Sequence, residues 1–334
     1  MRTFILSIAL LLIVFKPGFS QYNTFSDRIA KSKKYTFHSN FWINMHHFLY
    51  QQAKNKRVAQ KYAQPEREIL KKLPFVMKKN YDDAIAYYQQ NIIKKYFFND
   101  ELLTIRNALI MNKSQSKLKG KQFNRSLKQV LNNFAPVYRK HFWKMHHRAN
   151  QKIIKRYLST IQKFENEVFE LLGKWAQNPW KKGKVRVDIT KFANWAGAYT
   201  TTNPTIVTLS SVDERHKGGL FTEILFHEPC HSIISSRRYA VANAINEVVK
   251  VSGKKAPRIF WHLVLFYFSG KAIQMQYKKM GQPHKLYMQK RLISPFNFAL
   301  MEEYFTPYFA DKTTLKQSIT NILAEWQPRK RKKK

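Results

Sequence analysis

The sequence contains a single cysteine, Cys230, among 334 residues. One thiol excludes an intramolecular disulfide and a cysteine-rich metal site. The fold must therefore be held together by its hydrophobic core, to which a metal bound by other ligands can add. Acidic residues are also scarce, with 20 Asp and Glu against 60 Lys and Arg and a formal net charge of +40. Such an excess attracts anionic partners. It is spread along the chain, however, and no nucleic-acid-binding motif accompanies it, so we expect no specific nucleic-acid partner.

The sequence also lacks an apolar run long enough to span a bilayer. The run at residues 4–15 is shorter than a membrane span requires. Arg2 precedes it, and Lys16, Pro17 and Gly18 end it. This pattern predicts a signal peptide over residues 1–20, cleaved near Ser20, with an uncleaved anchor as the alternative. We therefore expect an exported protein, periplasmic or secreted, with no transmembrane segment in the mature chain.

Hydrophobic periodicity predicts the fold class. Residues 40–172 have mainly helical spacing, and residues 185–189 and 205–210 have the pattern of strands, with a turn predicted at 200–204. Further helices are predicted up to Trp326. The sequence thus indicates a mainly α protein with a small β-sheet, in the α+β class. Its predicted parts are a helical N-terminal region (21–180), a second region packed on it (181–326) and a basic tail (327–334). The tail is interpreted as a solvated end, and contact with an anionic envelope surface is the alternative.

The most specific motif is His227-Glu228-Pro229-Cys230-His231, in an apolar run after the predicted strand at 205–210. On a helix the two histidines project from one face, as two zinc ligands must. Glu228 lies about a quarter turn round, where a carboxylate reaches a metal-bound water and serves as general base. Pro229 argues against this arrangement, because proline removes a backbone hydrogen bond and clashes with the carbonyl of Leu225. A helix that began at Glu228 would turn His227 off the shared face.

The sequence leaves the third zinc ligand open between two residues. Glu247 follows His231 by sixteen residues, and His262 lies on the next predicted helix. If His262 is not a ligand, it can stabilise an oxyanion, with Tyr267 as a second donor, or it can be a core histidine.

Other polar residues near the motif and upstream of it carry weaker predictions. Glu223, one turn before His227, is either a hydrogen-bond acceptor for a ligand imidazole or a solvated residue. The adjacent pairs His46-His47 and His146-His147 are each interpreted as one packed and one exposed ring, and a member of one pair can reach the active-site cleft.

The motif His227-Glu228-x-x-His231 resembles the glutamate-type zincins, the thermolysin-like superfamily of metallopeptidases. Segments 198–201, 223–228 and 261–267 are similar to a group of exported, largely uncharacterised bacterial proteins, and the similarity extends to residues 40–50 and 135–139. The resemblance implies a zincin-like fold in which the active-site helix follows an edge strand, here residues 205–210. It also implies a zinc-activated water and hydrolysis of a peptide or related amide.

Two positions depart from the pattern of that group. Pro229-Cys230 replaces Ala-Ser, and Lys271 replaces an acidic residue. They raise the alternative of a catalytically degenerate zincin-like envelope protein that acts as a binding module. A basic protein that binds an anionic polymer is a second alternative, and its affinity would fall steeply with salt.

Overall fold

The computed structural model describes residues 27–54, 64–112, 116–202, 204–234 and 239–327. The predicted signal peptide and residues 328–334 of the predicted tail lie outside these ranges. The described chain is mainly helical with one small mixed sheet, which confirms the α+β prediction. None of its described helices combines the length and hydropathy that a membrane span requires.

The sheet has five strands in the order β1-β2-β3-β5-β4. Strands β2, β3 and β5 are parallel, and β1 and β4 are antiparallel to their neighbours at the two edges. Their bounds are β1 Arg28–Lys31, β2 Tyr35–His38, β3 Val185–Thr190, β4 Ala198–Thr202 and β5 Thr205–Ser210. The first two strands precede the helices of the predicted N-terminal helical region, so the sheet joins residues of both predicted regions.

The strand order corrects two predictions. Strand β5 was the expected edge, but it lies between β3 and β4, and β4 forms the edge. The predicted turn at 200–204 was also wrong in its first half, because Thr200 pairs with Val207 and Thr202 with Thr205. A run of β-branched threonines favours a strand, and this preference outweighs the turn signal that Pro204 contributes.

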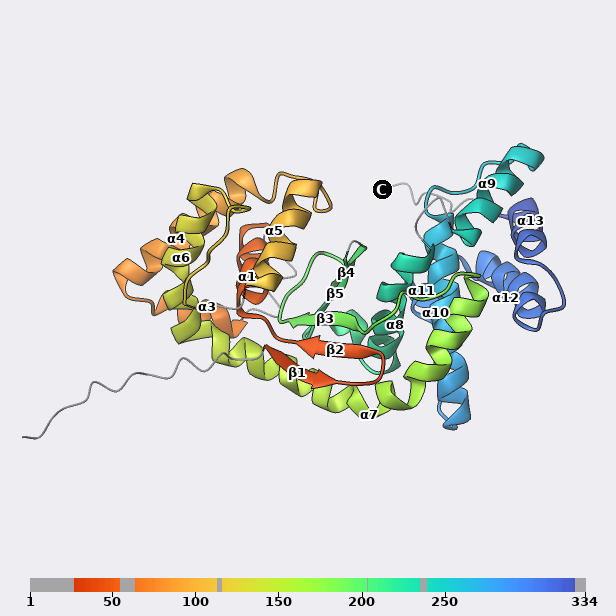
Figure 1. Ribbon diagram of the computed structural model, residues 1–334, viewed down its shortest axis with the longest axis horizontal. Helices are drawn as coiled ribbons and strands as arrows, with labels where there is room; N and C mark the ends of the chain where they lie inside the picture. Colours follow the sequence, from red (N-terminus) through yellow and green to blue (C-terminus); the bar gives the residue numbers. More distant parts are fainter. Residues whose placement is uncertain (1–26, 55–63, 113–115, 203, 235–238, 328–334) are drawn as a thin grey trace, which may run out of the picture.

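The helices form two groups with the sheet between them, and the long helix α7 runs past the sheet from one group to the other (Figure 1). The first group is α1 Phe41–Lys54, α3 Gln64–Lys71, α4 Phe75–Asn91, α5 Asp100–Met111 and α6 Arg125–Tyr138. Helix α7, Lys144–Trp175, follows a π-helical turn at Arg139–Trp143. The second group is α8 Gly219–Ile234, α9 Ala240–Ser252, α10 Phe260–Lys279, α11 Tyr287–Arg291, α12 Pro295–Phe309 and α13 Leu315–Glu325.

Each helix group has its own hydrophobic core, and α7 contributes to the larger one. Its apolar residues from Ile154 onward recur every three or four positions, so they form one stripe. This stripe packs with one face of the sheet and with α8, α10, α12 and α13. The smaller core lies among α1, α4, α5 and α6 and reaches the sheet through Tyr199.

Helix α8 lies inside the larger core and is apolar on nearly all sides, as expected for a helix surrounded by other elements. It continues through Pro229, which settles the question of where this helix begins: His227 and His231 are both inside it. Proline cannot donate to the Leu225 carbonyl one turn earlier. The hydroxyl of Tyr35, on β2, donates to that carbonyl instead, at an oxygen–oxygen distance of 3.5 Å.

Candidate metal centre

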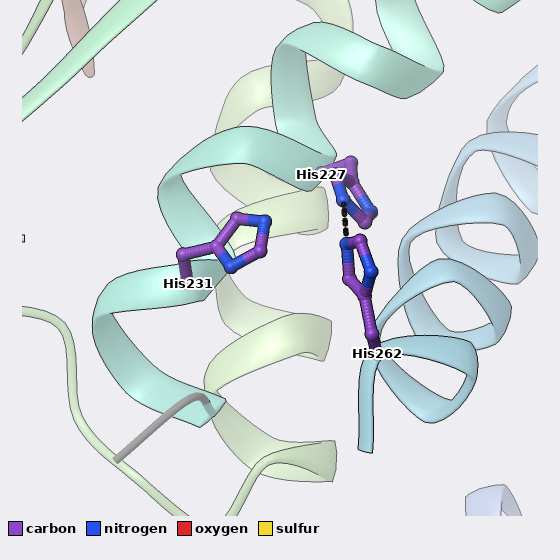
Figure 2. Close-up of side chains that lie close together, drawn as sticks. All are labelled: His227, His231 and His262. Carbon is purple, nitrogen blue, oxygen red and sulfur yellow. Dashed lines mark hydrogen bonds between the residues drawn. The ribbon is translucent and has the colours of Figure 1, made fainter. Parts of the chain in front are cut away.

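Three imidazole rings from two helices converge at one point (Figure 2). His227 and His231 lie on α8, and His262 lies in the first turn of α10. The Nε2 atoms of His227 and His262 are 3.2 Å apart, and one nitrogen from each of the three rings lies within 4.8 Å of the others. In the described part of the chain, no other group of His, Cys, Asp or Glu side chains meets this criterion.

Close packing of α10 against α8 brings His262 to the other two rings. Gly270 lies at the contact, where a Cβ atom would come within 2.6 Å of the Leu286 side chain and 3.0 Å of a Glu223 carboxylate oxygen. One turn before Gly270 on α10, the ring of Phe266 stacks on His227 with centroids 3.8 Å apart. The Oγ atom of Ser269 lies 3.4 Å from Nδ1 of His227. These contacts fix the orientation of the His227 ring, with Nε2 toward His262.

Burial keeps all three histidines neutral. It lowers the pKa of His262 to about 4. It also lowers the pKa of His231 to about 3, with a further contribution from His262, and that of His227 well below its usual value. Neutral imidazole is the form that donates a nitrogen lone pair to a metal ion, so the three rings are ready to serve as ligands without losing protons.

Glu228, the residue that follows His227 on α8, has a buried carboxylate. The Thr200 hydroxyl, from edge strand β4, lies 2.7 Å from its Oε2 atom and 2.9 Å from its backbone oxygen. Burial raises the pKa of Glu228 to about 7, and the hydrogen bond from Thr200 partly opposes this shift. A carboxylate with a pKa near the working pH is suited to accept and return a proton.

The structure does not bring the other predicted site residues to the histidines. The Glu247 carboxylate is 59% exposed and lies 3.0 Å from the Lys316 ammonium group. Tyr267 points into an aromatic cluster with Phe305 and Phe309, and burial, together with the nearby Glu302, raises its pKa. The predictions that Glu247 is the third ligand and that Tyr267 is an oxyanion donor therefore do not fit these positions. The convergence point instead contains His262.

Glu223 has neither of its two predicted roles. Its carboxylate is fully buried, so it is not a solvated residue. It accepts hydrogen bonds from Nε2 of His284 at 2.7 Å and from the backbone N–H of Tyr287 at 2.9 Å, and no hydrogen bond joins it to His227. Glu223 thus links α8 to the segment that leads into α11.

Lys271 and the upstream histidines also have defined partners. The Lys271 ammonium group lies 3.0 Å from a Glu302 oxygen, outside the three-histidine group. His46 and His47 are both buried, which corrects the prediction of one packed and one exposed ring. Nε2 of His47 lies 2.9 Å from the Tyr199 hydroxyl, so α1 contacts the edge strand one residue before Thr200.

Sequence reasoning missed two residues that contact the motif. Thr200 was assigned to a turn, although the threonine run 200–202 was a signal for a strand. Ser269 carries no local signal, because only the packing of α10 on α8 brings it to His227.

Comparisons of the chain with family models, curated protein sequences and solved structures found no match in any of the three.

Proposed function

We propose that this protein is an exported, zinc-dependent hydrolase of peptide or related amide bonds. It would use the His-Glu-x-x-His motif of the zincins, with His262 in place of the glutamate ligand of the thermolysin-like enzymes. The observation that carries the proposal is the convergence of His227, His231 and His262. The buried carboxylate of Glu228 follows His227 directly on α8. Three protein ligands that leave a fourth position open are the usual composition of a catalytic zinc site, and three histidines form one such set. Export is inferred from the pattern of residues 1–20.

The donor set fits zinc in type and in spacing. Two nitrogen ligands at about 2.0–2.1 Å from a tetrahedral zinc ion lie about 3.3 Å from each other. The Nε2 atoms of His227 and His262 are 3.2 Å apart. The position of His262 also argues against the alternative of a catalytically degenerate binding module. Such a module has no working metal site and would not need a third ligand within reach of both His227 and His231. Lys271, the departure that suggested degeneration, is paired with Glu302 and does not block the rings.

When bound, zinc supplies a Lewis acid and lowers the pKa of a coordinated water to about 7. The remaining chemistry belongs to the protein. Oε2 of Glu228 is held by the Thr200 hydroxyl, and Oε1 accepts no hydrogen bond from the described residues, so Oε1 is the atom that takes the proton from the attacking water. The same atom then returns the proton to the leaving amine. No described strand pairs with the outer side of edge strand β4, so an extended substrate can pair with it there, close to Thr200, which holds Glu228.

The test combines metal analysis with one substitution and a matched control. Purified mature protein should contain about one zinc per chain and hydrolyse members of a fluorogenic peptide library. Glu228→Gln should retain the zinc and lose about 10²–10⁴-fold in kcat, the usual contribution of a general base. Glu247→Gln, which changes an exposed carboxylate, should leave both properties unchanged. Absence of zinc, or equal hydrolysis by the Glu228→Gln variant, would contradict the proposal.

A further inference from the structure

A pocket of about 520 Å³ lies at the end of the sheet where β3 and β5 begin. Four lysines and two aromatic residues contribute to its lining: Lys34, Lys181, Lys182, Lys184, Phe169 and Trp180. We refer to it as the lysine pocket. Three of the lysines lie in one short segment that leads into β3, and Lys34 comes directly before β2.

The charge of the lysine pocket is not balanced by acidic side chains. No carboxylate lines it, and none of its four lysines forms an ion pair with an acidic residue in the described ranges. Some exposed lysines elsewhere on the protein have such partners, for example Lys79 with Asp83. A second cavity, of about 660 Å³, has only two lysines in its lining, Lys254 and Lys255, and is mostly apolar. The lysine pocket thus gathers four ammonium groups and no carboxylate around one cavity, and its field attracts an anion.

Two aromatic rings give the pocket a fixed wall. Trp180 packs on Phe169 with ring centroids 4.4 Å apart, and its Nε1–H donates to the Phe169 backbone oxygen at 2.6 Å. The Lys34 ammonium group lies 5.6 Å from the centre of the Phe169 ring, and the Lys184 ammonium group donates to the Ser32 backbone oxygen at 2.5 Å. The wall and these two ammonium groups are thus positioned before any ligand arrives, which reduces the entropy lost on binding.

The lysine pocket borders the candidate catalytic carboxylate. Ser232 contributes to its lining and lies four residues after Glu228 on α8, so the two side chains share a helix face about 6 Å apart along the axis. The wall formed by the sheet gives a similar distance between the pocket and Thr200, the residue that holds the Glu228 carboxylate. Thr205 lines the pocket and pairs with Thr202, which is two residues, about 7 Å, along β4 from Thr200.

We propose that the lysine pocket binds an acidic side chain of the peptide substrate, about two residues from the amide bond that is cleaved. This inference rests on the proposed function and adds the substrate class, which is acidic peptides. An extended peptide advances about 3.3 Å per residue, so two residues span the distance from Glu228 to the pocket. The carboxylate then meets the unpaired ammonium groups of Lys181 and Lys182, and the aliphatic part of its chain lies against Trp180.

The experiment measures binding apart from hydrolysis. Zinc-loaded Glu228→Gln protein is titrated with fluorescent peptides in which one Asp is moved from three residues before to three residues after a single cleavable bond. Each peptide is compared with its Asn counterpart. We expect one preferred position, with about tenfold tighter binding for Asp than for Asn. The double substitution Lys181→Glu and Lys182→Glu should abolish this preference. The matched control, Lys254→Glu and Lys255→Glu, makes the same charge change at the second cavity and should preserve it.

Each outcome bears on the inference separately from the proposed function. Equal binding of Asp and Asn peptides at all positions would overturn the inference even if zinc and Glu228-dependent hydrolysis are present. An equal loss of preference in both double variants would overturn it as well, since it would indicate attraction to the net charge alone. If the preference depends on Lys181 and Lys182 but wild-type protein cleaves no peptide, the pocket stands and the hydrolase proposal fails. All substituted lysines are exposed, and circular dichroism checks that the variants are folded.

Discussion

The Nε2 atoms of His227 and His262 lie 3.2 Å apart, although 35 residues separate the two histidines in the sequence. Helix α9 and its flanking segments intervene along the chain, and the packing of α10 against α8 closes the gap. A short contact between two ring nitrogens requires either a proton between them or a shared cation. Without a metal, two neutral rings can make this contact when Nε2–H of one donates to Nε2 of the other. Burial lowers the pKa of both rings, so neither becomes a cation that would repel a metal ion at this position.

This relationship predicts which residue completes the metal site. His262→Ala should weaken zinc binding by more than the 10–100-fold that typically follows loss of a residue behind a ligand. Glu247→Gln should leave zinc affinity unchanged, because that carboxylate is exposed and pairs with Lys316. Competition with a chromogenic zinc chelator measures both affinities. The opposite ranking of the two variants would restore Glu247 as the ligand and contradict the geometry.

The role of Glu223 gives a second prediction. Glu223→Gln removes the charge from the hydrogen bonds to His284 and Tyr287, so the free energy of unfolding should fall by about 1–2 kcal/mol. Zinc affinity should change less than twofold, because Glu223 does not contact His227. Urea unfolding of the metal-free protein and the chelator competition measure the two quantities. A 10–100-fold loss of zinc affinity with unchanged stability would instead indicate that Glu223 supports a ligand.

The fold class was predictable because its signals are local. Helical spacing and the alternation at residues 185–189 depend on neighbouring residues, and they indicated a mainly helical chain with a small sheet. Strand order was not predictable in the same way. Whether β4 or β5 forms the edge depends on which strand pairs with β3, and no pattern within either strand encodes that pairing.

The candidate site shows the same division between local and long-range information. The i, i+4 spacing indicated that His227 and His231 share a helix face, but nothing near His262 indicated that α10 packs on α8. From the sequence we also expected too large an effect of Pro229. The hydroxyl that replaces its missing N–H comes from Tyr35, which lies 190 residues before the acceptor Leu225. Glu223 could not be recognised as buried, since its partners His284 and Tyr287 lie more than 60 residues further along the chain.

The contact between Tyr35 and Leu225 predicts a coupling with Pro229. Tyr35→Phe should lower the free energy of unfolding by about 1 kcal/mol, because it leaves the Leu225 carbonyl without a donor. In a Pro229→Ala background the restored backbone N–H donates to that carbonyl, so Tyr35→Phe should have a smaller effect. A double-mutant cycle by urea unfolding should give a coupling energy of at least about 0.5 kcal/mol.

Tyr308 provides the control for this cycle. Its hydroxyl donates to the Trp175 backbone oxygen at 2.8 Å and has no connection to Pro229. Tyr308→Phe should therefore have the same effect on stability in both backgrounds. If Tyr35→Phe is equally destabilising with and without Pro229, the carbonyl of Leu225 does not depend on the tyrosine.

The buried His46 predicts how stability depends on pH. Burial, with a contribution from Arg106, lowers its pKa to about 3 in the folded protein, against about 6.5 in the unfolded chain. Between pH 6 and pH 4 the unfolded chain therefore binds one proton more at this residue, and the free energy of unfolding decreases as pH falls. One such proton contributes about 1.4 kcal/mol per pH unit.

His46→Gln removes this titration, so the free energy of unfolding of the metal-free variant should fall less steeply than that of the wild type, by about 1.4 kcal/mol per pH unit. The matched control is Tyr88→Phe, which removes the 2.9 Å hydrogen bond to Nδ1 of His46 but retains the imidazole. It should lower stability at pH 7 and keep the wild-type slope. Urea unfolding at intervals between pH 7 and pH 4 gives all three slopes. Identical slopes for wild type and His46→Gln would mean that His46 is protonated in the folded protein, and that α1 is open to water at this point.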